Sequence, residues 1–142
     1  VTKRAAAIFA QNRDIHIPPH ASGHVEGECS LPGASKLLAL MGHFHVHGTK
    51  VKAWVRPLGK PPVTVYESEE QAHPLWASLD DVHLGPEDRL GWSCDYDNNG
   101  NDPLEYGPLE ATQEHCNLFA FYTLDQGEAP FVPCVIDTKD QD

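Results

Sequence analysis

Residues 36–48, KLLALMGHFHVHG, join an apolar run to three histidines at two-residue spacing. Side chains alternate between the two faces of a strand, so His43, His45 and His47 share one face. The other face carries apolar side chains, which we expect in the core: Leu40, Phe44 and Val46. The stretch therefore predicts one strand with an apolar inner face and a histidine-bearing outer face.

Similar short alternating runs recur on both sides of this stretch, separated by turn-forming residues. They cover residues 14–18, 49–57, 62–68, 88–96 and 116–123. The chain holds 12 prolines and 11 glycines, and no window shows the apolar spacing of an amphipathic helix. The pattern predicts an all-β fold, an antiparallel β-sandwich of jelly-roll type.

The length of 142 residues suits one domain with a real core, so we expect residues 1–142 to form a single β-sandwich domain. The polar tail, residues 136–142, is expected to be frayed. Because the first residue is Val1 and not Met, we expect the sequence to be a mature or excised piece. No apolar run is long enough to span a bilayer, which predicts no membrane insertion.

The charge is acidic, with 21 Asp and Glu against 10 Lys and Arg and a formal charge of −11. Nucleic-acid binding needs a basic surface that neutralises phosphates, and the sequence offers none. An anionic membrane surface is disfavoured for the same reason. We therefore expect neither partner.

Four cysteines are present, and none forms a CxxC pair: Cys29, Cys94, Cys116 and Cys134. An even number in a domain of this size indicates two disulfides, for which three pairings exist. Four buried thiols are the alternative. Disulfides persist in oxidising compartments, so we expect an extracytoplasmic protein, periplasmic or secreted.

The histidine spacing itself indicates a metal site, with a solvated strand face as the alternative. Residues two apart on a strand are roughly 6.6 Å apart, and His43 and His47 would be about 13 Å apart. Two neighbouring imidazoles can therefore bind one ion, and a further ligand must come from elsewhere in the chain. Imidazole ligands without thiolate or carboxylate favour copper or zinc.

Three segments together resemble a known family. They are LALMGHFHVHGTKVKAWVRPLG (38–59), LGWSCDY (90–96) and EHCNLFAFYT (114–123). The first resembles the ligand strand in the C-terminal domain of the copper type II, ascorbate-dependent monooxygenases, where Gly follows a His-x-His pair after three residues. Here these residues are His43, His45 and Gly48. The other two segments look like the family's two cysteine-bearing strands, and the family fold is a β-sandwich of jelly-roll type.

The resemblance implies a ligand set and a disulfide pairing. The family has Glu-Met-Cys where this chain has Glu114, His115 and Cys116, and the Met is its third copper ligand. His43, His45 and His115 would thus hold one copper ion, with zinc as an alternative metal. The implied disulfides are Cys94–Cys116 and Cys29–Cys134. His47 and Met41 would support the site or act as alternative ligands; a competing set is His45, His47 and His115.

The resemblance also implies a function. The family domain activates O2 and hydroxylates a C–H bond, with electrons from a reductant and from a second copper in an upstream domain. Its peptide-hydroxylating members use an Arg and a Tyr where this chain has Met41 and Phe119, so we do not expect a peptidylglycine substrate. The alternative is a non-catalytic extracytoplasmic copper-binding or copper-transfer module that receives copper from a donor protein. Five further histidines have no assigned role: His16, His20, His24, His73 and His83.

Overall fold

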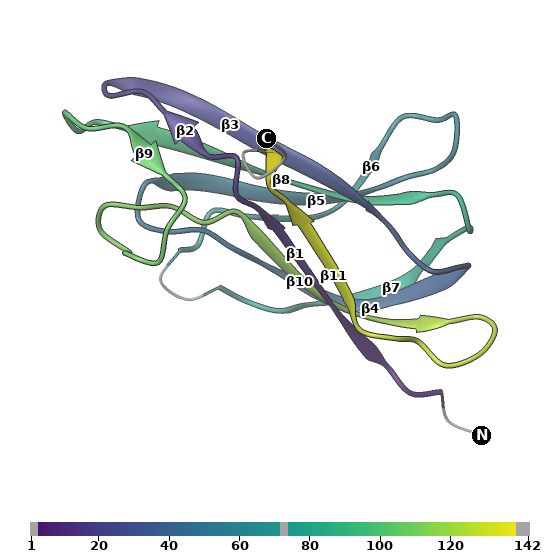
Figure 1. Cartoon of the computed structure of the whole chain (residues 1–142). Helices are drawn as coiled ribbons and strands as arrows, with labels where there is room; N and C mark the ends of the chain where they lie inside the picture. Colours follow the sequence, from purple (N-terminus) through teal and green to yellow (C-terminus); the bar gives the residue numbers. More distant parts are fainter. Residues whose placement is uncertain (1–2, 72–73, 139–142) are drawn as a thin grey trace.

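The computed structural model describes residues 3–71 and 74–138, and every named element in these ranges is a β-strand (Figure 1). The strands are β1 (Ala6–Asn12), β2 (His16–Ile17), β3 (Ala21–Ser30), β4 (Ser35–His43), β5 (Gly48–Arg56), β6 (Val63–Ser68), β7 (Ala77–Leu84), β8 (Arg89–Asn98), β9 (Leu104–Glu105), β10 (Asn117–Leu124) and β11 (Val132–Ile136).

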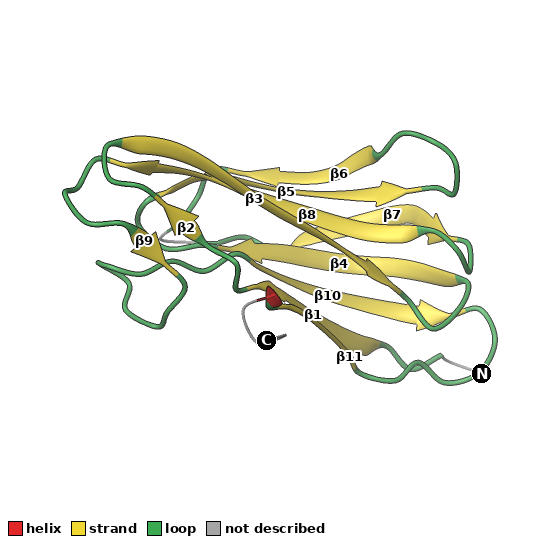
Figure 2. Cartoon of the chain, turned by 45° about the horizontal axis from the view of Figure 1, so that its top comes forward, coloured by secondary structure: helices red, strands yellow, loops and turns green. Residues whose placement is uncertain are grey.

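The strands form a β-sandwich, as the sequence predicted. One sheet has the order β11-β1-β10-β4-β7, the other the order β3-β8-β5-β6, and β2 pairs with β9. Figure 2 shows β3, β5, β6 and β8 as a layer over β1, β4, β10 and β11. All pairings are antiparallel except β1 with β11. The β1–β11 pair is parallel because the chain reverses between β10 and β11 and both strands flank β1.

The core lies between the two sheets and is built around large side chains with almost no exposure: Phe44, Trp92, Tyr96 and Tyr122. Leu40 and Phe44 are buried as expected. Val46 is not, since 55% of it is exposed, so its predicted place in the core is wrong.

The predicted strand over residues 36–48 is interrupted at its histidines. β4 ends at His43 and β5 begins at Gly48, because here the chain leaves one sheet and enters the other. Phe44 turns into the core, and a Cβ at position 48 would overlap its ring, so glycine is needed for this close approach. His45 and His47 therefore lie in a turn, closed by a 3.0 Å hydrogen bond from the Gly48 N–H to the His45 carbonyl.

Both predicted disulfides are confirmed, and each joins one sheet to the other. Cys29 on β3 is bonded to Cys134 on β11. Cys94 on β8 is bonded to Cys116, which directly precedes β10. The second bond therefore fixes the start of β10 against the middle of the opposite sheet.

Part of the tail expected to be frayed is paired. Ile136 ends β11, and Thr138 donates hydrogen bonds to the Asp14 carboxylate at 2.9 to 3.2 Å. Residues 139–142 lie outside the described residues. In the described part of the chain, no helix is long and apolar enough to cross a membrane.

Removing Cys29–Cys134 is expected to destabilise the fold markedly, since this bond closes a loop with a sequence separation of 105 residues. We predict that the Cys29→Ala, Cys134→Ala double variant loses about 2–5 kcal/mol in free energy of unfolding. Urea denaturation of the oxidised proteins measures this. An unchanged urea midpoint would show that the two sheets do not need this link.

Candidate metal centre

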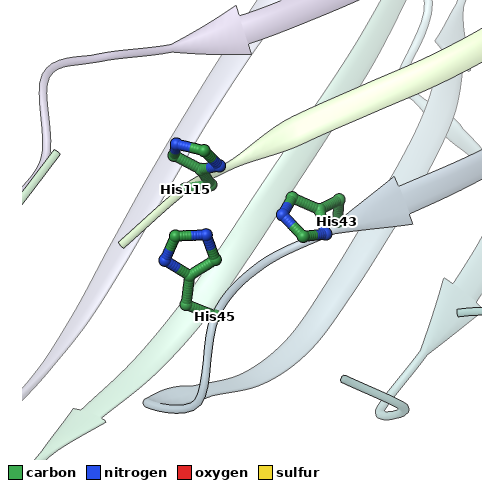
Figure 3. Close-up of side chains that lie close together, drawn as sticks. All are labelled: His43, His45 and His115. Atoms are coloured by element: carbon green, nitrogen blue, oxygen red, sulfur yellow. The ribbon is translucent and has the colours of Figure 1, made fainter. Parts of the chain in front are cut away.

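Three histidines from two separate segments meet at one end of the sandwich. His43 ends β4, His45 lies in the following turn, and His115 lies two residues before β10. Cross-strand pairing of His43 with Asn117 brings the segments together. One ring nitrogen from each histidine lies within 4.8 Å of the other two. Figure 3 shows the three rings facing one another, with centroids 4.2 to 5.5 Å apart.

A buried carboxylate holds the turn that carries His45. Glu114 is 0% exposed and accepts the backbone N–H of His45 on Oε1 and that of His47 on Oε2, both at 2.8 Å. Burial raises the pKa of Glu114, and the two backbone donors oppose that rise. Since Glu114 directly precedes His115, one residue ties the two histidine-bearing segments together.

The backbone at His115 is fixed from the opposite sheet. The Tyr96 hydroxyl donates to the His115 carbonyl at 2.6 Å, and the Trp92 indole N–H donates to the Cys116 carbonyl at 3.1 Å. The Cys94–Cys116 disulfide lies directly beside these contacts. On its outer side, the His115 ring stacks on Tyr106 with centroids 5.3 Å apart.

Hydrogen bonding selects which histidine nitrogen is free. His45 Nδ1 lies 2.8 Å from the Gln113 carbonyl, which only accepts, so Nδ1 carries the proton and Nε2 has the free lone pair. His115 Nδ1 is buried and has no hydrogen-bond partner. A buried polar atom without a partner is costly, and a bound metal ion is one way to satisfy it.

The environment of His43 and His115 favours their neutral form, because both pKa values are lowered. Burial lowers the pKa of His115 to about 4, with further lowering by His45 and His43 and an opposing effect of Glu110. Burial, followed by His45, lowers the pKa of His43. Metal ions bind neutral imidazole, so these side chains need not lose a proton near neutral pH.

The donor set therefore fits a copper or zinc ion. Three imidazoles converge from two segments, one lone pair is oriented by a backbone carbonyl, and one buried nitrogen lacks a partner. Imidazole donors suit copper and zinc, and an outer hydrogen bond that fixes the tautomer is typical of metal-binding histidines.

The other residues singled out by the sequence lie around this group. His47 is not among the three converging histidines, and its Nε2 lies 3.0 Å from the Ala111 carbonyl. Met41 is half-buried and pairs with Phe119 on the same sheet face as His43.

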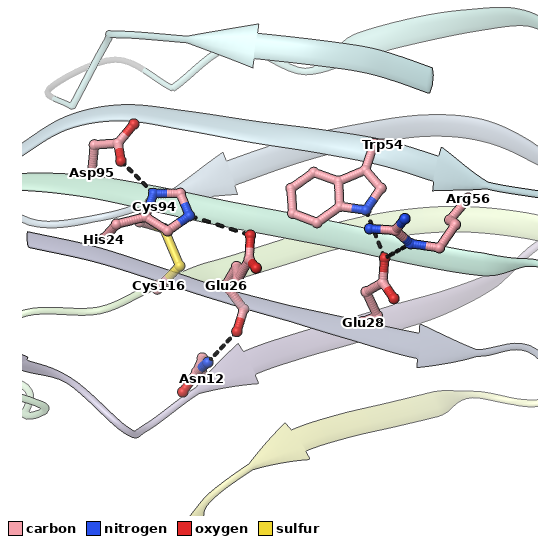
Figure 4. A network of polar contacts seen from close by, with 9 residues as sticks. All are labelled: Asn12, His24, Glu26, Glu28, Trp54, Arg56, Cys94, Asp95 and Cys116. Atoms are coloured by element: carbon pink, nitrogen blue, oxygen red, sulfur yellow. Dashed lines mark hydrogen bonds and ion pairs between the residues drawn. A yellow bond between two sulfur atoms is a disulfide. The ribbon is translucent and has the colours of Figure 1, made fainter. Parts of the chain in front are cut away.

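Four of the remaining histidines lie on the surface: His16, His20, His24 and His83. His16 contacts Glu105 at 2.6 Å, His20 contacts Asn101 at 2.8 Å, and His83 contacts Asp81 at 2.9 Å. His24 on β3 contacts the carboxylates of Asp95 and Glu26, as Figure 4 shows. The Cys94–Cys116 disulfide is drawn in the same figure. His73 lies outside the described residues.

Comparison with known families identifies the domain. The family model of the copper type II ascorbate-dependent monooxygenase C-terminal domain matches residues 5–141, nearly the whole chain. The chain belongs to this family. No match was found among curated proteins. The resemblance that the sequence indicated is thus confirmed. The structure of this monooxygenase family domain adds a cluster of three histidines that could hold a metal ion.

Several residues that shape the site were missed in the sequence. Glu114, Tyr96 and Gln113 act on the histidines through backbone groups, which leave no pattern in side-chain spacing. Only Glu114 could have been identified from the sequence, because it is a charged residue that directly precedes a candidate ligand and a disulfide cysteine.

We predict that Glu114→Gln destabilises the protein by about 1–3 kcal/mol. An amide accepts from one of the two N–H groups and presents a donor to the other, which leaves a buried donor unpaired. Urea denaturation measures the loss, and Glu87→Gln in an exposed turn is the matched control, with a change within about 0.5 kcal/mol. Equal stability of the two variants would contradict the role of Glu114.

The low pKa of His115 predicts acid sensitivity of the metal-free protein. Its pKa falls from 6.5 to about 4 on folding, so the unfolded chain binds more protons in that window and stability falls as the pH falls through it. We expect the stability advantage of wild type over His115→Asn to shrink between about pH 7 and about pH 4.5 in urea denaturation. A pH-independent difference would contradict the burial of a neutral His115.

Proposed function

We propose that this domain binds one copper ion through His43, His45 and His115 and is the O2-activating domain of a monooxygenase that hydroxylates a C–H bond. The observation that carries the proposal is the convergence of three ring nitrogens within 4.8 Å, in a chain that belongs to the copper monooxygenase family. Residues 1–142 would act as a single domain.

Each protein group has a definite task in this proposal. When bound, copper supplies one-electron redox chemistry toward O2. His45 offers Nε2, because its Nδ1 is occupied by the Gln113 carbonyl. Glu114 keeps the turn closed, and the Cys94–Cys116 disulfide keeps His115 in register with His43.

The sheet face beside the histidines is suited to an apolar substrate. Met41 and Phe119 occupy neighbouring positions on it, one side-chain pair away from His43 and Asn117. Farther along lies a hollow of about 320 Å³ without charged side chains, lined by Ala7, Ile8, Phe9, Trp76, Phe119, Ala120, Phe121 and Phe131. This volume is at the lower end for small-molecule pockets. A free carboxylate would find no cation there, which supports a substrate other than peptidylglycine.

The second candidate is a copper-binding or copper-transfer module without turnover. The specific observation in its favour is His115, since a third imidazole is a stronger donor than the thioether of the family and is better suited to holding copper or zinc. In either case we place the protein outside the cytoplasm, because two disulfides need an oxidising compartment. The monooxygenase would take electrons from ascorbate or from an upstream domain, and the carrier would take copper from a donor protein.

Copper loading tests the site. We expect wild type to bind one Cu(II) with nitrogen hyperfine structure in its EPR spectrum. His43→Ala, His45→Ala and His115→Ala should each weaken binding at least about tenfold, in line with the loss of a ligand or its support. His83→Ala on β7 is the matched control and should bind like wild type. Unchanged binding by His115→Ala would contradict a site built from two segments.

Turnover separates the two functions. We expect O2 consumption with ascorbate that depends on an added apolar substrate and yields hydroxylated product in equal amount. O2 consumption that yields only peroxide, together with transfer of copper to an acceptor, would favour the carrier.

A further inference from the structure

We propose that Glu110 is a fourth, carboxylate ligand of the metal in its oxidised state. The inference rests on the three-histidine site proposed above and adds a donor from a different segment, the loop between β9 and β10. It changes the site from three neutral donors to three neutral donors and one anion.

The first argument is distance. Glu110 Oε1 lies 3.9 Å from His45 Nε2, the nitrogen whose lone pair is free. For an ion with bonds of about 2.0 Å, neighbouring ligand atoms are about 2.8 Å apart in the square-planar arrangement that Cu(II) favours and about 3.3 Å apart in a tetrahedral one. The 3.9 Å separation between Glu110 Oε1 and His45 Nε2 is somewhat longer than a ligand spacing, so the Glu110 side chain has to move toward the ion when it binds.

The second argument is placement. His45 has only 3% of its side chain exposed, whereas Glu110 has 59% exposed, so the carboxylate approaches the cluster from the solvent side.

The third argument is that the loop is held to the histidine turn by the residues that follow Glu110. His47 Nε2 donates to the Ala111 carbonyl at 3.0 Å, and His45 Nδ1 donates to the Gln113 carbonyl at 2.8 Å. This arrangement gives His47 a task in holding the loop. The loop also closes on itself, with the Gln113 N–H donating to the Leu109 carbonyl at 2.8 Å.

The carboxylate itself is oriented by a further side chain. Gln71 Nε2 donates to Glu110 Oε2 at 3.0 Å, which leaves Oε1 directed to His45. One oxygen is thereby occupied by an amide and the other is available, the usual arrangement for a carboxylate that binds a metal through one oxygen.

An anionic oxygen donor has a predictable effect. Hard oxygen ligands favour Cu(II) over Cu(I), whereas soft thioether ligands favour Cu(I). With His115 in place of the family's methionine, Glu110 would shift the site further toward the oxidised ion. The consequence is a lower Cu(II)/Cu(I) potential than three imidazoles alone would give.

The test compares Glu110→Gln with Glu128→Gln, which removes the same charge from an exposed turn between β10 and β11. Cu(II) and Cu(I) affinities are measured separately by competition with chelators, EPR spectra are recorded, and thermal unfolding of the metal-free variants checks the fold. We expect Glu110→Gln to lose at least about tenfold in Cu(II) affinity and less than about threefold in Cu(I) affinity, with an altered EPR spectrum. A tenfold selective loss corresponds to a potential higher by about 59 mV.

Two outcomes contradict the inference, and a third contradicts the proposed function on which it rests. Equal Cu(II) affinity and identical spectra for the two variants would show that Glu110 does not bind the metal. Equal losses for Cu(II) and Cu(I) would show that it supports the loop and is not an anionic ligand. Failure of wild type to bind copper would contradict the proposed function itself, and is distinct from the other two because it appears before any substitution is made.

Discussion

The site depends on one buried carboxylate. Glu114 accepts the backbone N–H groups of His45 and His47, and so closes the turn by which the chain passes from β4 to β5. Burying a carboxylate costs free energy. The two backbone hydrogen bonds offset this cost, and they form only when the turn brings both N–H groups to the Glu114 oxygens. Because His115 directly follows Glu114 in the chain, Glu114 sets the position of both histidine-bearing segments. The Cys94–Cys116 disulfide and the Tyr96 hydroxyl then fix the far side of His115.

The strands that could be predicted were those with alternating apolar residues, such as the ones that became β5, β8 and β10. Four other strands, β1, β3, β7 and β11, were not predicted, because their sequences show a weaker alternation of apolar and polar residues. In β3 the inner face includes Gly27, where a Cβ would overlap the Trp92 ring, so close packing removes the apolar residue that would have marked the strand. β7 and β11 are edge strands, and Pro133 in β11 is tolerated only at such an edge.

Part of the candidate metal site could be predicted from the spacing of the histidines in the sequence. The alternation predicted only that two neighbouring histidines of the stretch bind one ion, and the choice of His43, His45 and His115 followed from the family motif. The break between His43 and Gly48 could not be predicted, since it depends on Glu114, which is 66 residues or more away in the chain. The same holds for Glu110 and His47, whose roles arise from a loop that long-range hydrogen bonds fold over the cluster.

The central claim is that position 115 supplies a metal ligand. X-ray absorption of the Cu(I)-loaded His115→Met variant tests it directly, since it restores the thioether of the family at that position. The account predicts that the variant gains a sulfur neighbour of copper and loses one imidazole relative to wild type. A variant spectrum without sulfur, and with an unchanged number of imidazoles, would show that copper is held elsewhere and would contradict the account.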